Sequence, residues 1–105
     1  MKYVSTRGQA PILGFEDVLL TGLAADGGLY VPETWPVLDH TAIASFAGAA
    51  YEAVAGEVMA PFVGDAIPRP ELDAIISSAY AEFRHRTVAP LVQTGPDDWL
   101  LELFH

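Results

Sequence analysis

The stretch that decides the fold lies at the C-terminal end and consists of Trp99-Leu100-Leu101-Glu102-Leu103-Phe104-His105. Alternate residues of a strand point to opposite faces, and here both sets are apolar, with Glu102 as the only charged residue. A strand that is apolar on both faces expects cover on both, as in the interior of an α/β sheet. Two interpretations follow: the 105 residues are the front part of a larger protein, or the stretch is a buried edge strand at a natural C-terminus.

Composition limits the function. The chain has 105 residues, of which 51% are hydrophobic, enough for one small domain with a modest core. Its net charge of −9 disfavours nucleic-acid partners and anionic membrane surfaces, since both need clustered Lys and Arg. No apolar run reaches the roughly 18 residues of a spanning helix, and no signal peptide is recognisable. Without cysteine there is no disulfide or thiolate metal site, and we predict a cytoplasmic protein.

Hydrophobic spacing and turn residues predict the elements that precede the C-terminal stretch. Strands are expected at residues 2–5 and 29–31, and helices at residues 15–23, 41–46, 49–63 and from Pro70 to Arg84-His85-Arg86. These last three cations would face the negative end of the helix dipole. Residues 90–94 and 99–104 would form a hairpin around the turn at residues 95–98. Trp35 is expected to tuck against the core. The residues predicted to form the buried stripe of the last helix are Leu72, Ile75, Ile76, Ala79, Tyr80 and Phe83.

Few residues suggest chemistry. Ser5, Thr6 and Arg7 could hold an anion through two hydroxyls and a guanidinium, although a solvated strand end with a surface arginine fits the same pattern. The run at residues 26–28 contains two adjacent glycines and predicts a structural turn rather than a phosphate loop, because a strand follows it. The three histidines show no metal-ligand spacing, and we find no nucleophile motif or acid/base pair.

Taken together, several motifs resemble the N-terminal portion of threonine synthase, in the longer bacterial and fungal branch of that family. They are Ser5-Thr6-Arg7, the helix at residues 15–23, Asp26-Gly27-Gly28-Leu29-Tyr30-Val31-Pro32, Gly64-Asp65-Ala66-Ile67-Pro68, Pro90-Leu91-Val92 and Leu101-Glu102-Leu103-Phe104-His105. Each motif is weak alone, but their order and spacing match over essentially the whole chain.

The resemblance implies an α+β fold: a small domain of three to four helices with short strands, ending in the first strand of an absent catalytic core. Residues 1–88 would be the small domain, and residues 89–105 a hairpin leading into the pyridoxal-phosphate domain. The family converts O-phospho-L-homoserine and water to L-threonine and phosphate. Its Schiff-base lysine follows the Leu-Phe-His motif, whereas the only lysine here is Lys2. The resemblance thus implies pyridoxal phosphate in a full-length parent, none in this chain, and an inactive chain on its own.

The resemblance also implies site residues. Ser5, Thr6, Arg7 and His105 would contact the phosphate-bearing substrate, and no residue is expected to act as a catalyst, cofactor ligand or metal ligand. Two rival interpretations remain. The chain could be a stand-alone acidic interaction module that binds a partner, dimerises or swaps through its C-terminal strand, or a regulatory paralogue that kept only the small domain.

Overall fold

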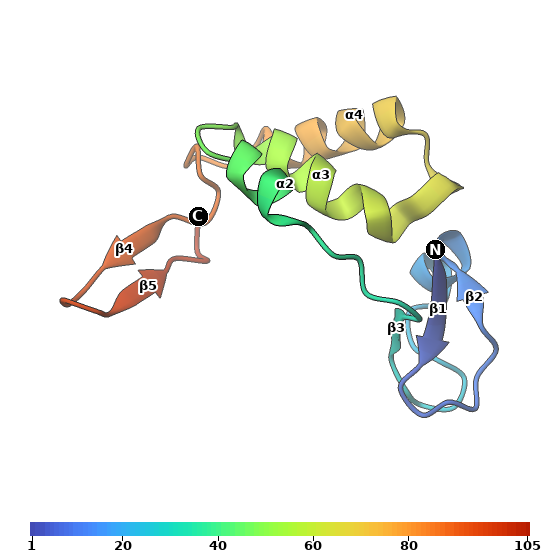
Figure 1. The fold of residues 1–105 in the computed structure, drawn as a ribbon. Helices are drawn as coiled ribbons and strands as arrows, with labels where there is room; N and C mark the ends of the chain where they lie inside the picture. Colours follow the sequence, from blue (N-terminus) through green and yellow to red (C-terminus); the bar gives the residue numbers. More distant parts are fainter.

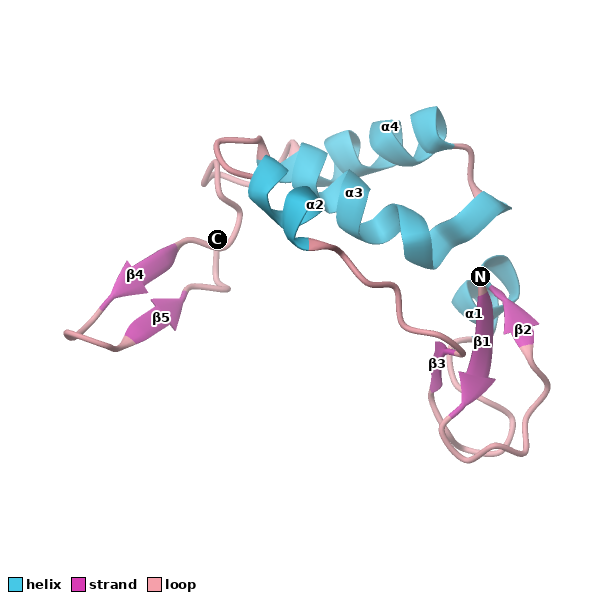
Figure 2. Ribbon diagram, in the orientation of Figure 1, coloured by secondary structure: helices cyan, strands magenta, loops and turns pink.

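The computed structural model describes residues 1–105 and has three parts (Figure 1). The sheet lobe contains β1 (Lys2–Ser5), β2 (Leu13–Gly14), α1 (Phe15–Thr21) and β3 (Tyr30–Pro32). The helical lobe contains α2 (His40–Ser45), α3 (Tyr51–Val63), the 3-10 turn η1 (Gly64–Ala66) and α4 (Arg69–Tyr80). A separate hairpin contains β4 (Leu91–Gln93) and β5 (Trp99–Leu101), and Figure 2 shows it joined to the helices by loop only. The predicted α+β class, with three to four helices and short strands, is confirmed, and the structure has four helices.

β1 is the middle strand of an antiparallel sheet with the order β2-β1-β3. Tyr3 pairs with Leu13 on one side and with Pro32 on the other. The strand predicted at residues 2–5 is confirmed, whereas β2 was not predicted because two residues carry no periodic signal. β3 extends to Pro32, one residue beyond the prediction, since a proline without an N–H is tolerated on an edge strand.

α1 begins at Phe15, as predicted, but ends at Thr21 rather than at residue 23. Gly22 follows it with φ of 72°, a left-handed conformation that terminates the helix. The Gly22 N–H donates to the Val18 carbonyl at 3.0 Å and closes the last turn.

α2 and α3 start close to their predicted positions. Asp39 caps α2, with its Oδ1 accepting from the Ala42 N–H at 2.8 Å. α3 packs on α4 around a small core formed by Val63, Leu72 and Ile76. Burial of Leu72 and Ile76 is confirmed.

For other residues of the predicted stripe the expected burial is wrong, because Ile75 is 49% and Phe83 is 41% exposed. α4 also ends at Tyr80, so Arg84, His85 and Arg86 lie beyond its last turn, and their predicted pairing with the helix dipole is wrong. The chain leaves the helix through a tightened turn in which the Phe83 N–H donates to the Tyr80 carbonyl at 3.1 Å. The Phe83 ring packs beside the Tyr80 ring, with centroids 5.4 Å apart.

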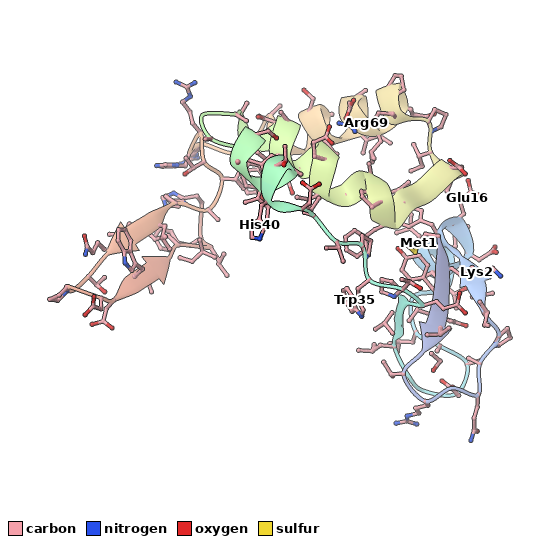
Figure 3. The ribbon with its side chains drawn as sticks, viewed as in Figure 1. Met1, Lys2, Glu16, Trp35, His40 and Arg69 are labelled. Atoms are coloured by element: carbon pink, nitrogen blue, oxygen red, sulfur yellow. The ribbon has the colours of Figure 1, made fainter.

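The two lobes meet at the end of α3. The Tyr3 hydroxyl donates to the Phe62 carbonyl at 2.7 Å, and Phe15 packs against the helical core. Trp35 lies in the connecting segment and packs edge-on against the Phe62 ring, with the ring centroids 6.2 Å apart. Trp35 is still 64% exposed. The prediction that Trp35 tucks against the core is therefore wrong, and Figure 3 shows its side chain on the segment between the two lobes.

The predicted hairpin forms, with Val92 opposite Leu100 in an antiparallel pair, but the prediction that its second strand reaches residue 104 is wrong, because β5 ends at Leu101. All six residues of β4 and β5 are exposed. The chain reaches the hairpin through Val88, a buried residue with φ of 58°. The radius of gyration is 16.6 Å, whereas a single compact domain of this length has about 13 Å. The structure contains no helix that is both long and apolar enough to cross a membrane.

Candidate functional site

The carboxylate of Asp26 accepts hydrogen bonds from both turns at the end of the sheet lobe. Its Oδ1 accepts from the Ser5 hydroxyl at 2.7 Å and from the Gly28 N–H at 2.9 Å. Its Oδ2 accepts from the N–H groups of Gln9 and Ala10, both at 2.9 Å. Two segments that are distant in sequence, residues 5–10 and 26–28, are thereby fixed to each other.

The same hydrogen bonds set the charge state of Asp26. Partial desolvation alone would raise the pKa of its carboxyl, but the bonds from Ser5, Gly28, Gln9 and Ala10 stabilise the anion and together lower the pKa to about 2. Asp26 is therefore ionised throughout the neutral range.

The two hydroxyls predicted to bind an anion already have partners. Ser5 is buried, and its Oγ accepts from the Arg7 N–H at 3.1 Å besides donating to Asp26. Thr6 Oγ1 accepts from the Leu29 N–H at 3.0 Å, while the Thr6 N–H donates to the Leu29 carbonyl at 2.8 Å. Thr6 is exposed, and its hydroxyl proton makes no bond within the chain.

Arg7 is held at one edge of its guanidinium and open at the other. Its Nη1 donates to the Asp26 backbone carbonyl at 3.0 Å, and the group lies against Gly27, where an added Cβ would come within 2.8 Å of Nη1. The ion pairs of the chain belong to Arg69 and His105, so no carboxylate is paired with Arg7. Arg7 is exposed.

His105 lies elsewhere. Its Nε2 is 2.8 Å from Glu102 Oε2, and its ring contacts those of Phe104 and His85 at centroid distances of 4.6 and 5.1 Å. His85 follows α4, and Figure 1 shows the chain beyond α4 far from β1. The structure thus brings Ser5, Thr6 and Arg7 together and leaves His105 apart from them.

Asp26 is the site residue that sequence reasoning missed. The Asp-Gly-Gly run was interpreted as a turn, and the turn is confirmed: Gly27 has φ of 78° and its N–H donates to the Ala24 carbonyl. The available signal was an acid directly before two glycines, but its partners at residues 5–10 lie too far along the chain to be inferred from spacing.

Two larger cavities lie in the helical lobe. The first, of about 810 Å³, separates the start of α3 from the turn after α4 and is lined by Tyr51, Tyr80, Arg84 and Arg86, among others. The second, of about 490 Å³, lies beside the ion pairs of Arg69. Neither includes a residue predicted to bind substrate.

Comparison with known sequences gives one consistent result. The family described as "Threonine synthase N terminus" matches residues 2–80. The chain is 52% identical over 105 residues to the threonine synthase of Pseudomonas aeruginosa, covering all of this chain and 22% of that protein. It is 42% identical over 106 residues to threonine synthase-like 2 of Rattus norvegicus, again covering all of this chain and 22% of the relative.

Solved structures agree. The pyridoxal-phosphate-bound threonine synthase of Brucella melitensis superposes with a TM-score of 0.94 at 50% identity, over the whole of this chain and 23% of that one. The chain therefore spans less than a quarter of the length of the relatives it matches.

Proposed function

Because this chain belongs to the threonine synthase N-terminal family, we propose that it serves as the small domain of an enzyme that converts O-phospho-L-homoserine and water to L-threonine and phosphate. The match to residues 2–80 carries this proposal. We place the enzyme in the cytoplasm, as expected for amino-acid biosynthesis.

The pyridoxal phosphate of such an enzyme does not fit the residues present here. The cofactor needs a lysine to form its Schiff base, and Lys2, the only lysine, is exposed at the start of β1 (Figure 3). Lys2 lines none of the four larger cavities. In our proposal the cofactor belongs to the rest of the enzyme, and this chain alone is inactive.

We assign residues 1–88 to the small domain and residues 89–105 to the connection into the catalytic domain. Support comes from the hairpin, which Figure 1 shows apart from both lobes. Trp99, Leu100 and Leu101 are each more than half exposed. Apolar side chains in this number gain stability once another surface removes them from water, which the catalytic domain would do.

For the substrate we propose contacts from Thr6 and Arg7, whose free donors face solvent, with Ser5 holding their turn and His105 contributing from the other side of the chain. Replacing Arg7 by Ala in the enzyme should raise KM or lower kcat by more than tenfold, roughly the loss of one charge-assisted hydrogen bond.

A chimera tests the domain assignment. The 105 residues replace the aligned N-terminal part of the Pseudomonas aeruginosa threonine synthase, and phosphate release from O-phosphohomoserine is followed. The chimera should turn over substrate, whereas the Pseudomonas remainder and the 105-residue chain, each alone, should not. A chimera that shows the absorbance of the bound cofactor yet lacks activity contradicts the proposal, as does phosphate release by the 105 residues alone.

A second candidate rests on the hairpin edges. β4 and β5 each pair only with the other, so the outer backbone groups of both strands are free to add a strand. The 105-residue chain could then dimerise or swap through this hairpin. Light scattering across a concentration series tests this candidate. A mass that doubles with concentration, and that returns to the monomer value in Leu100→Lys, supports association. A monomer at every concentration excludes it.

A further inference from the structure

We infer that Asp26 is a positioning residue, which holds the turn at residues 5–10 so that the open edge of Arg7 and the Thr6 hydroxyl meet an oxyanion, either phosphate or carboxylate. The class of ligand rests on the proposed function. The role of Asp26 rests on the geometry of this chain.

The first step is the rigidity of the turn. All four donors to the Asp26 carboxylate come from residues 5–10 and from Gly28, at 2.7 to 2.9 Å. A carboxylate offers two oxygens with about four acceptor sites, so these bonds use its capacity. An Asn side chain, with one carbonyl oxygen and an amide that is itself a donor, cannot accept them all.

The second step is the fit of the glycines. A Cβ at Gly28 would collide with Ser5 Oγ and lie 3.0 Å from both Asp26 Oδ1 and Thr6 Oγ1. A Cβ at Gly27 would lie 2.8 Å from Arg7 Nη1. The turn at residues 26–28 therefore matches the shape of the Ser5-Thr6-Arg7 turn and allows the guanidinium to rest on the backbone.

The third step is the charge that remains free. Nη1 of Arg7 is bound to a neutral carbonyl, and none of the carboxylates in this acidic chain forms an ion pair with it. The Asp26 carboxylate is nearby, but its oxygens are occupied by the four donors of the first step. A guanidinium fixed at one edge keeps its other N–H groups in a planar arrangement suited to two oxygens of an oxyanion.

Nuclear magnetic resonance of the 105-residue chain tests this inference without enzymatic turnover. The side-chain Nε–H of each arginine is followed while inorganic phosphate, or acetate at equal ionic strength, is added. In the wild type, Arg7 should shift saturably, and Arg84 and Arg86, which are exposed and lie outside the sheet lobe, serve as internal references. Saturation by phosphate but not acetate identifies the phosphate group as ligand, and the reverse identifies a carboxylate.

Asp26→Asn should weaken that binding by about tenfold, the effect of one lost charge-assisted contact. Asp17→Asn, an equal charge change on exposed α1 of the same lobe, should leave it unchanged. If Asp26→Asn loses its dispersed amide spectrum, Ser5→Ala decides, because it removes the hydroxyl that donates to Asp26 and accepts from the Arg7 N–H, with no change to the backbone of residues 26–28. The inference is overturned if the Nε–H of Arg7 responds to the anion no more than that of Arg84. It is also overturned if the folded variants bind the anion as tightly as the wild type. An inactive chimera would contradict the proposed function while leaving this result in place.

Discussion

At the scale of single residues, Asp26 differs from the other carboxylates of the chain by the donors around it. Its pKa of about 2 lies below the ordinary value of 3.8, so folding favours the ionised form. The stabilisation is complete above about pH 5, where the carboxyl is almost fully ionised even in the unfolded chain, and is lost as the pH falls through about 2.

The matching prediction concerns Asp26→Asn. At pH 7 we expect its unfolding midpoint to lie roughly 5 °C below that of the wild type, since the donors of two turns lose their acceptor. Because the wild type loses this stabilisation on acidification, the difference should shrink between pH 4 and pH 2. Thermal unfolding followed by circular dichroism measures both. A gap that stays constant over this range would show that the carboxylate charge contributes nothing, and Asp17→Asn controls for the change in net charge.

Asp26 also shows what sequence reasoning reaches and what it misses. Ser5, Thr6 and Arg7 were identified as a cluster, because polar residues beside a glycine at a strand end are a local signal. Ser5 donates to the carboxylate of Asp26, 21 positions later in the chain. This contact depends on the pairing of β1 with β3, and no local pattern predicts that register.

At the scale of elements, the lobes are joined by the contact between β1 and the end of α3. Tyr3→Phe removes the hydroxyl that donates to the Phe62 carbonyl and should lower the free energy of unfolding by roughly 0.5–1.5 kcal/mol. Tyr30→Phe is the matched control, since its hydroxyl donates to the Pro11 carbonyl at an exposed position within one lobe. Urea unfolding compares the two, and equal losses would mean that the contact between lobes has no special weight.

α4 offers a second test, because its predicted and observed buried faces differ. Leu72→Ala should lower the free energy of unfolding by roughly 2–5 kcal/mol, since Leu72 is 4% exposed and its loss leaves a cavity beside Val63. Ile75→Ala should change it by less than about 1 kcal/mol, because half of that side chain is in water. If a urea titration gives similar losses of unfolding free energy for the two variants, Ile75 contributes to the core as much as Leu72 does.

Helix positions were predictable where the signal is periodic, and their ends were not. α3 and α4 follow from apolar spacing over a dozen residues. α4 stops at Tyr80, where the Phe83 N–H donates to the Tyr80 carbonyl and closes a tighter turn, and no glycine or proline marks that position in the sequence. Gly22 was a visible stop signal for α1, but its left-handed φ was not assumed.

At the scale of the whole molecule, the separation of the hairpin from the two lobes gives an extended shape, whose radius of gyration can be measured by scattering. We expect the dilute chain to keep a radius of gyration close to 16.6 Å, because the hairpin stands apart from both lobes (Figure 1). Small-angle X-ray scattering at several low concentrations gives this value free of association. A radius near 13 Å, typical of one compact domain of this size, would show that the parts collapse on one another in solution.

The sheet order has a further consequence for synthesis on the ribosome. β1 is the earliest of these strands to emerge, yet it lies between β2 and β3, so its second edge stays unpaired until Pro32 has left the exit tunnel. The partner of its Tyr3 hydroxyl, Phe62, comes 59 residues later, a delay on the order of seconds at ordinary translation rates. The sheet lobe therefore cannot reach its final packing before α3 is made.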